Sequence, residues 1–519
     1  MNLLNRKGLR HRKAPAAAWV NAVLLVMMFL AGGAGAIDAA TFTVNELGDA
    51  GDGVCTDGTC TLRDAIGLAN AAAGDDVIDF SVTGSIALVL GELVIEDNGK
   101  TTINGPGKDL LTVSGNNVSR VFFVDRFATA EIDGMTISNG NGFGAISPSF
   151  GAGIMIFEAT LTLTNSTVSD NTAGSSGGGI FNDRSNLIVE NSTISGNSAL
   201  VGGGIDSSAS VLPRPILTMT NSTVSGNSST NAGGGISNRG GTAILTNSTV
   251  SGNTTGSYGG GINNRGISKF VLTNSTINGN SAGISGGGIY NDQDPAPPDP
   301  DNNATVTLNN TIVANNDTGG DCSNVVTNTV NASSSLIESG IDCVNGTNVN
   351  NLTGDPGLGL LQNNGGPTET HALLRGSIAI NAGSNLLAVD PNGNPLLTDQ
   401  RGNGFDRIVA SNVDIGSFEV TDSDGDGVLD VEDICPGTVI PEIDNFDLMK
   451  RRYAVNAAGD FVNVNGESSG FTIADTGGCS ATQIIQALGL GNGHSKFGIP
   501  HGILKSWINS LPVLFSNDT

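Results

Sequence analysis

The heptapeptide "NSTVSGN" occurs twice without change, at residues 221–227 and 247–253. Close variants are "NSTVSDN" at 165–171, "NSTISGN" at 191–197, "NSTINGN" at 274–280 and "NTIVANN" at 310–316. Such a string is open to three interpretations: a row of N-glycosylation acceptors, a repeated catalytic motif, or a bend that the fold makes once per repeat. The residues around each copy favour the bend.

Apolar residues recur at fixed offsets around the first asparagine of each copy. Two residues before it stand Leu163, Val189, Met219, Leu245, Leu272 and Leu308. Four residues before it stand Leu161, Leu187, Leu217, Ala243, Phe270 and Val306. These two positions share the parity of a strand with one buried face. Three residues after it the parity is opposite, at Val168, Ile194, Val224, Val250, Ile277 and Val313. The Asn-Ser-Thr segment between them is therefore predicted to be a bend.

A glycine signature runs in step with the heptapeptide. "GAGI" at 151 is followed by "GGGI" at 177, 202, 233, 259 and 286, with spacings of 26, 25, 31, 26 and 27 residues. A period of this length indicates a repeat architecture, and short β runs without helical patterns between them favour a parallel β-helix. Equivalent residues would then stack about 4.8 Å apart. We expect apolar columns and a ladder of the first asparagines (Asn165, Asn191, Asn221, Asn247, Asn274 and Asn310) with amides bonded along the axis.

Both ends of the repeat have helical patterns. In "TLRDAIGLANA", Leu62, Ala65, Ile66 and Ala69 fall on one face of a short helix, which would cap the solenoid. "ATQIIQALGL" and "GILKSWINSL" near the C-terminus predict a small α-rich unit.

The first 40 residues have the order of a secretory signal peptide. A basic leader, "MNLLNRKGLRHRK", precedes the apolar run "AAAWVNAVLLVMMFLAGGAGA" and small residues at Ala36 and Ala40. Removal of these residues would take away five basic residues and one acid, leaving 18 Lys+Arg against 48 Asp+Glu and a net charge of −30. A surface this acidic excludes nucleic acid as a partner and favours cations.

Six cysteines suit an oxidising compartment. Fifteen pairings are possible, and proximity along the chain favours Cys55–Cys60, Cys322–Cys343 and Cys435–Cys479.

Three stretches resemble known families. "TFTVNELGDAGDGVCTDGTCTLRDAIGLAN", with Cys60-Thr61-Leu62-Arg63-Asp64-Ala65, resembles the CSLREA module, with Thr for Ser and Asp for Glu. The repeats resemble right-handed parallel β-helix proteins, including the Gly-Gly-rich repeats of polymorphic outer-membrane proteins. "DPGLGLLQNNGGPTETHALLRGSIAINAGSN" with "DQRGNGFDRIVASNVDIGSFE" is similar to the choice-of-anchor Q domain. The resemblance implies an all-β, right-handed, pectin-lyase-like solenoid in an exported bacterial protein, secreted or at the cell surface, and brings no agreed activity.

The stretch "DSDGDGVLDVEDICPGT" at 422–438 has the oxygen-ligand spacing of a Ca²⁺ loop. The predicted ligands are Asp422, Asp424, Asp426, the Val428 carbonyl, Asp430 and Asp433. It also resembles the thrombospondin type 3 repeat, including the following Cys435-Pro436. Asp rather than Glu at the last position predicts modest affinity and leaves Mg²⁺ open.

The expected organisation follows from these features: a signal peptide (1–40), a cap with first strands (41–100), β-helix repeats (101–350), the end of the solenoid (351–420), a calcium loop (421–440) and a helical unit (441–519).

Two functions remain open from the sequence. Residues 130–350 contain no His and a single Lys, Lys269, although Arg184, Arg239 and Arg265 follow three of the glycine boxes with Asp183 beside the first. We therefore expect no catalytic residues and a binding or adhesion protein for an extracellular glycan or cell-surface ligand. The alternative is a polysaccharide lyase or glycoside hydrolase that uses the solenoid face. His494 and His501 are spaced too loosely to predict a metal site.

Overall fold

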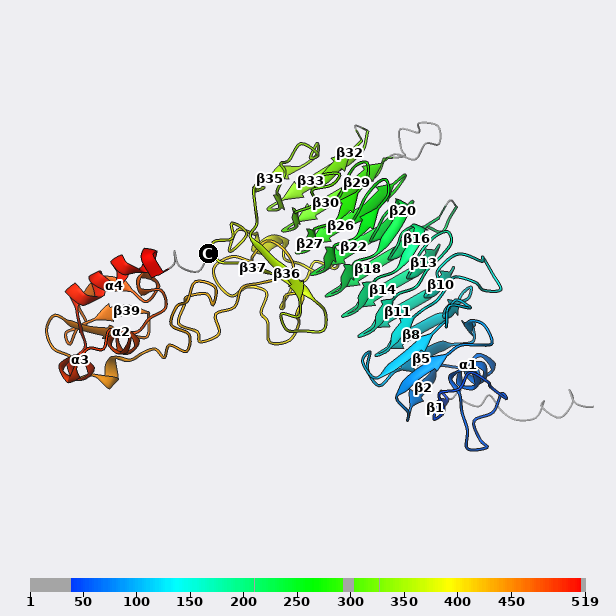
Figure 1. Ribbon diagram of the computed structural model, residues 1–519, viewed down its shortest axis with the longest axis horizontal. Coiled ribbons are helices and arrows are strands. Elements are labelled where there is room, and N and C mark those ends of the chain that lie inside the picture. The colour runs from blue at the N-terminus through cyan, green and yellow to red at the C-terminus, as the bar shows by residue number, and fades with distance from the viewer. Residues whose placement is uncertain (1–38, 210, 293–302, 326, 515–519) are drawn as a thin grey trace, which may run out of the picture.

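The computed structural model describes residues 39–209, 211–292, 303–325 and 327–514. The predicted signal peptide lies outside them, apart from its last two residues. The described chain coils into a parallel β-solenoid that is followed by a small separate unit (Figure 1).

Three parallel sheets run along the solenoid axis. Sheet A consists of β1 (Thr41–Val44), β2 (Asp76–Phe80), β5 (Lys100–Asn104), β8 (Thr129–Asp133), β11 (Thr160–Thr164), β14 (Asn186–Glu190), β18 (Ile216–Thr220), β22 (Thr242–Thr246), β26 (Lys269–Thr273), β30 (Thr305–Asn309), β33 (Thr329–Ser333) and β35 (Asn348–Val349). Sheet B consists of β3 (Gly84–Ala87), β6 (Leu111–Ser114), β9 (Thr136–Ser138), β12 (Thr167–Ser169), β15 (Thr193–Ser195), β19 (Thr223–Ser225), β23 (Thr249–Ser251), β27 (Thr276–Asn278), β31 (Ile312–Ala314) and β34 (Leu336–Ile337).

Sheet C carries the face that follows each glycine box. It consists of β4 (Leu93–Ile95), β7 (Phe122–Val124), β10 (Ile154–Phe157), β13 (Ile180–Asp183), β17 (Ile205–Ser208), β21 (Ile236–Arg239), β25 (Ile262–Arg265), β29 (Ile289–Asp292) and β32 (Cys322–Asn324). A short sheet D lies between B and C in four turns, with β16 (Ser198–Val201), β20 (Ser228–Ala232), β24 (Thr254–Thr255) and β28 (Ser281–Ala282).

The predicted columns of apolar residues are confirmed. Leu163 pairs in register with Val189, and the column continues through Met219, Leu245, Leu272 and Leu308. Val168 opens the second column, which reaches Val313. All these side chains are fully buried, so the interior is one continuous apolar core along the axis and the predicted β-helix is confirmed.

The predicted ladder at the first asparagine is wrong in its position. Each first asparagine has a left-handed backbone, with φ between 46° and 50°, a region that Asn tolerates and β-branched residues do not. This conformation makes the bend, and one axial amide bond is present among the six, from Asn310 Nδ2 to Asn274 Oδ1 at 3.1 Å.

The last asparagine of the heptapeptide forms the ladder instead. Its column contains Asn171, Asn197, Asn227, Asn253, Asn280 and Asn316, with exposures of 0–1%. In each step the backbone N–H and the side-chain Nδ2 both donate to the Oδ1 of the next residue, at 2.8–3.0 Å. These asparagines face the interior, where the ladder supplies the bonds that buried amides need.

The predicted capping helix and disulfides are also confirmed. Helix α1 (Leu62–Ala71) begins at Thr61, whose side chain accepts from the Asp64 N–H in a capping box. Arg63 fixes the helix to the first turn by an ion pair with Asp49 and a hydrogen bond to the Gly91 carbonyl. The three disulfides join Cys55 to Cys60, Cys322 to Cys343 and Cys435 to Cys479.

Residues 351–420 begin at the end of the solenoid and then fold back along sheet B, where β36 (Leu358–Gln362) and β37 (Thr370–Leu373) form an antiparallel pair (Figure 1). Gln400 bonds Thr223 and Thr249 of two neighbouring turns at 2.9 and 2.6 Å. Buried ion pairs hold this segment in shape, Arg401 to Asp399 at 2.7 Å and Arg407 to Glu419 at 3.0 Å.

The C-terminal unit contains the predicted helices and also a sheet that the sequence analysis missed. The helices are α2 (Ala481–Ala487), α3 (Asn492–Phe497) and α4 (His501–Leu514). The antiparallel sheet consists of β38 (Arg452–Val455), β39 (Asp460–Val462), β40 (Ser468–Thr472) and β41 (Ile499–Pro500). Single-turn 3₁₀ segments lie at η2 (Ile443–Asn445) and η3 (Ala474–Thr476) in this unit, and at η1 (Asn385–Leu387) in the folded-back segment. This unit has its own apolar core, which includes Phe461 and Ile484.

Candidate functional site

The glycine boxes build a concave corner on the outside of the solenoid. The first glycine of each box has a φ of 53–67°, so an L side chain there would be strained. A Cβ added at Gly202 would lie 2.6 Å from the Asp206 Cβ, and one added at Gly233 would lie 2.8 Å from the Ser237 Cβ. The corner therefore folds the segment before the box tightly against sheet C, and a trough forms along the axis.

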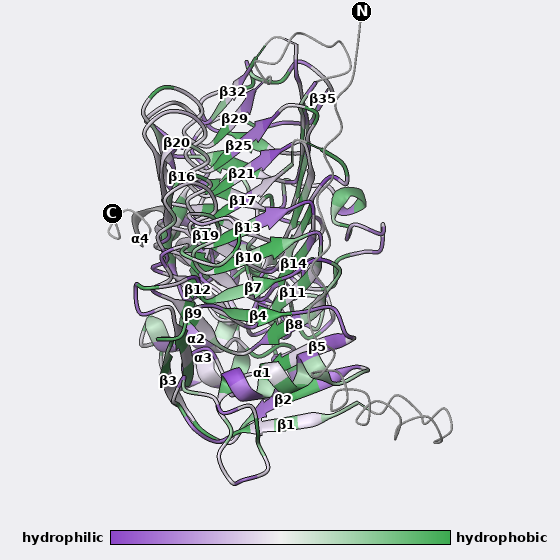
Figure 2. Ribbon diagram, turned by 90° about the vertical axis from the view of Figure 1, so that its right-hand side faces the viewer, coloured by the Kyte–Doolittle hydropathy of each residue, from purple (hydrophilic) through white to green (hydrophobic). Residues whose placement is uncertain are grey.

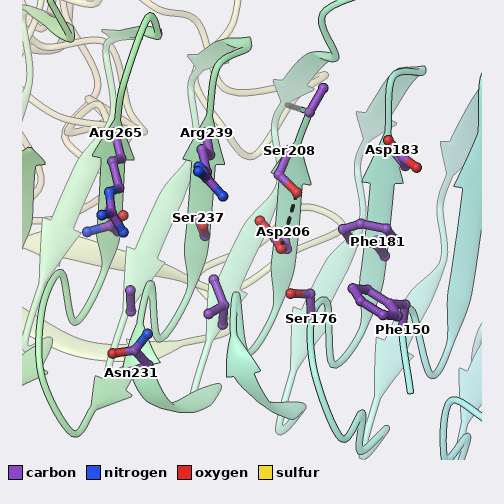
Figure 3. A pocket seen from close by; sticks show the side chains of 14 residues that line it. Phe150, Ser176, Phe181, Asp183, Asp206, Ser208, Asn231, Ser237, Arg239 and Arg265 are labelled. Carbon is purple, nitrogen blue, oxygen red and sulfur yellow. Dashed lines mark hydrogen bonds between the residues drawn. The ribbon is translucent and has the colours of Figure 1, made fainter. Parts of the chain in front are cut away.

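Three columns of residues line this trough, which we call the axial groove (Figure 3). The floor is Phe181, Asp206, Ser237 and Asn263, which are in register on the outer face of sheet C and 3–7% exposed. One wall contains Phe150, Ser176, Val201 and Ala232. The other contains Asp183, Ser208, Arg239 and Arg265. The groove has a volume of about 400 Å³, within the range of small-molecule sites.

The groove begins where sheet C changes from apolar to polar, a change visible in Figure 2 from β7 and β10 toward β21 and β25. Before the groove, the floor column consists of Val94, Phe123 and Met155. Phe123 and Met155 are buried in a cluster with Phe181, and Phe150 packs against it. The rings of Phe150 and Phe181 lie 5.0 Å apart, so an aromatic wall closes this end.

Asp206 is the perturbed acid of the groove. Burial raises its pKa to about 6, although nearby hydroxyls of Ser176, Ser237 and Ser208 and the charge of Arg239 oppose the shift. Its Oδ2 accepts a long hydrogen bond from Ser208 at 3.4 Å, whereas its buried Oδ1 accepts none. An ionised, incompletely bonded carboxylate in a groove is poised to accept hydrogen bonds from a ligand.

The arginines that follow the glycine boxes are partly brought together. Arg239 and Arg265 stand on adjacent strands in one column with Asp183 and Asp292. Arg265 Nε lies 3.7 Å from the Asp292 carboxylate. Arg184 lies one residue outside the column, where it pairs with Asp183 at 3.1 Å and with Glu158.

The predicted calcium loop forms a second candidate site. Asp422, Asp424 and Asp426 each offer a carboxylate oxygen, and these oxygens lie within 4.8 Å of one another. Burial and the charges of the neighbouring aspartates raise the pKa of Asp426 to about 6. Asp426 is 3% exposed, and its Oδ2 has no hydrogen-bond partner. A cation would relieve both the repulsion and the unbonded oxygen.

The remaining predicted ligands are placed differently. Asp430 accepts hydrogen bonds from the N–H and hydroxyl of Ser423 at 2.7 Å and from Thr421. Burial alone would raise the pKa of Asp430, but these bonds keep it below the usual range. Asp433 accepts from the Cys435 N–H at 2.7 Å, and burial together with the neighbouring aspartates raises its pKa. Val428 is buried in the core of the C-terminal unit.

Sequence reasoning missed the groove floor. A signal was present, because the residue after the isoleucine of each glycine box is Met155, Phe181, Asp206, Ser237, Asn263 and Tyr290 in turn. The residue before this position is isoleucine in all six boxes and the residue after it is asparagine in four of them, whereas the position itself differs in each box.

Comparison with known proteins supports the fold. Residues 91–255 match the family model described as "Right handed beta helix region". No curated protein matches the sequence. A crystal structure of pectate lyase Pel9A is 13% identical, with a TM-score of 0.41, over 74% of this chain and 97% of that one. An overall likeness this low says nothing about activity.

We predict that Asp206 makes the stability of the protein depend on pH. Its folded pKa of about 6 lies above the unfolded value of 3.8, so the folded state binds the proton more tightly. That stabilisation is complete below the unfolded pKa and is lost as pH rises through about 6. The free energy of unfolding of Asp206→Asn relative to the wild type should therefore increase by roughly 2–3 kcal/mol between about pH 4 and pH 7. A difference that does not change with pH would contradict the burial argument.

Proposed function

We propose that this protein is an exported, non-catalytic binding protein that presents the axial groove to an extracellular glycan or cell-surface ligand. The observation that carries the proposal is the groove itself: a trough of amide, hydroxyl, guanidinium and carboxylate groups that ends at an aromatic pair. Such a mixture of convergent polar groups beside apolar surface is typical of a recognition site.

Export is supported by several features together. The N-terminal 40 residues have the pattern of a signal peptide, and the three disulfides suit an extracellular protein. Among the described residues, no helix combines the length and apolar character needed to cross a bilayer. The CSLREA-like and choice-of-anchor Q-like stretches resemble those of exported bacterial proteins, which is consistent with a secreted or surface location.

Calcium binding at the thrombospondin type 3-like loop is the second part of the proposal. Asp422, Asp424 and Asp426 would hold the ion, and its positive charge would offset the repulsion between their carboxylates. The loop also joins two cores, because Leu429 and Val431 pack against the core of the folded-back segment while Val428 and Ile434 pack against the core of the C-terminal unit. A bound ion would stiffen this joint rather than perform chemistry.

An enzyme is a second candidate, favoured by one observation: the raised pKa of Asp206 beside Arg239. A carboxylate with a pKa of about 6 is suited to general acid–base catalysis. A polysaccharide lyase or glycoside hydrolase would use it on a bound glycan.

Calcium binding is tested by calorimetric titration of Ca²⁺ into residues 41–519. We expect a single site, weakened by at least about tenfold in Asp426→Asn because that change removes the charge of the buried ligand. Glu432→Gln removes the same charge from an exposed neighbour in the loop and should bind as the wild type does. Absence of heat in the wild type, or equal loss in both variants, would overturn the assignment; a parallel titration with Mg²⁺ decides between the two ions.

Binding without turnover is tested with a glycan array and intact bacterial cells, followed by an assay of sugar release from a panel of polysaccharides. We expect retention on an array glycan or on cells and no new reducing ends or unsaturated products. Sugar release by the wild type that disappears in Asp206→Asn would show that the protein is an enzyme and not a non-catalytic binding protein.

A further inference from the structure

We infer that the axial groove binds the end of an uncharged, hydroxyl-rich glycan chain, which lies along the solenoid axis from Phe181 to Asn263. This inference rests on the proposed binding function, and it specifies the chemical class of the ligand and the part of the chain that is recognised.

The groove ends on its N-terminal side at Phe150, and a buried arginine holds the loop that leads to it, residues 141–150, in place. The Arg120 side chain is 0% exposed and pairs with Glu92 at 2.5 Å. Its Nη2 donates to the carbonyls of Ser147 and Phe150, both at 2.9 Å, and Glu92 Oε1 accepts from the Ala145 N–H at 2.7 Å.

The loop leads directly into Phe150, which packs against Phe181. A side chain at Gly144 would collide with Glu92 and Arg120, at 2.3 and 2.5 Å, so the loop lies directly on the ion pair. Beyond this wall the floor residues Met155 and Phe123 are 0% and 2% exposed, so a glycan chain would find no open floor past it and would end there. The same ring pair offers an apolar surface to the C–H face of the terminal sugar.

The floor beyond the wall is suited to hydroxyl groups. Asp206 Oδ1 accepts no hydrogen bond although it is buried, and sugar hydroxyls are donors that would bond it. Ser237 and Asn263 follow on the next two rungs. From Phe181 to Asn263 the floor extends over three rung spacings, roughly 14 Å, which accommodates a few sugar units in a row.

The charges of the groove are balanced, which favours an uncharged ligand. Asp183 is paired with Arg184 at 3.1 Å, and Arg265 lies 3.7 Å from Asp292. The positive charge of Arg239 lowers the pKa of Asp206 and so favours its ionised form. The whole chain carries a net charge of −26, so an anionic polysaccharide would be repelled during approach.

The other end of the floor is marked by a second aromatic pair. Tyr290 follows Asn263 in the floor column, and Tyr258 follows Ala232 in the wall column. Their rings stack at 4.7 Å between centroids. Sugars beyond the closed end therefore meet another apolar platform before the chain leaves the groove.

The ligand class is tested by isothermal titration of the full exported chain with matched neutral and anionic oligosaccharides. The neutral probes are cello-, xylo-, manno- and malto-oligosaccharides, and the anionic probes are oligogalacturonates and alginate oligosaccharides of the same lengths. We expect binding of a neutral probe and none of the anionic series.

The position of the site is tested with two pairs of variants. Asp206→Asn and Ser208→Trp should each weaken binding by at least about tenfold, since one removes the buried acceptor and the other fills the groove. Asp170→Asn, an exposed aspartate on another bend, and Thr218→Trp, on the outer face of sheet A in the next strand, are the matched controls. They should bind as the wild type does, and thermal melts verify that all four variants are folded.

End recognition is tested by competition between an oligosaccharide and a long polymer of the same sugar. If the groove takes chain ends, the two compete equally at equal concentrations of chains. If it takes internal segments, the polymer competes in proportion to its sugar units, and the end-binding inference is wrong.

The remaining outcomes separate this inference from the proposed function. Glycan binding that persists in Asp206→Asn and Ser208→Trp overturns the groove assignment, and binding confined to the anionic probes overturns the ligand class; either result leaves a binding protein. A wild-type protein that retains neither glycans nor cells removes the proposed function as well.

Discussion

The structure depends on one interaction: asparagines that the turns place inside the solenoid bond to their equivalents in the next turn. The column from Asn171 to Asn316 makes this interaction with two donors and one shared acceptor oxygen at each step. A second interior column, from Asn238 through Asn264 and Asn291 to Asn324, is joined by the side chains alone, each Nδ2 donating to the next Oδ1 at 2.9–3.0 Å. Each ladder amide also donates to a carbonyl of the preceding turn, as Asn227 does to Ile194, so a shift of one turn would leave buried groups unbonded in its neighbours.

This interaction separates the parts of the repeat that can vary from those that cannot. Interior asparagines, aliphatic columns and corner glycines recur because each has a neighbour of its own kind above and below. The outward position after each glycine box has no such partner, and there the chain changes from Met155 and Phe181 to Asp206, Ser237 and Asn263. The invariant residues thus form the frame of the trough, and in the proposed function the variable ones would decide what it binds.

Much of the fold could be predicted from the sequence because each turn repeats the same residue types at the same offsets. Parity around the heptapeptide predicted the buried columns, the apolar face of residues 62–71 predicted the cap, and proximity predicted all three disulfides. Parity could not say which of two asparagines in the heptapeptide turns inward. That choice depends on the left-handed backbone at the first one, which the sequence signals only as a preference of Asn and Gly for positive φ.

The sites were less predictable for a related reason. The calcium loop is a local motif, so its first three aspartates could be grouped from spacing alone, but Asp430 turns toward Ser423 and Thr421, a contact that spacing does not encode. The groove combines residues from five successive turns and from both sides of a glycine corner, and the loop that leads to Phe150 is held by a buried Arg120–Glu92 pair. None of these contacts is close in sequence. The groove residues are aligned by the pairing of strands between successive turns, which local sequence patterns do not encode.

The most direct test of whether amide bonds between turns hold the solenoid in register is a double-mutant cycle on the inner asparagine ladder. Asn227→Ala and Asn253→Ala remove adjacent rungs, so their effects on the free energy of unfolding should be non-additive by at least about 1 kcal/mol. Asn171→Ala and Asn280→Ala, which share no bond, should add. Additive losses in both cycles would show that the asparagines act independently, and the claim that the solenoid is held in register by amides bonded from turn to turn would be contradicted.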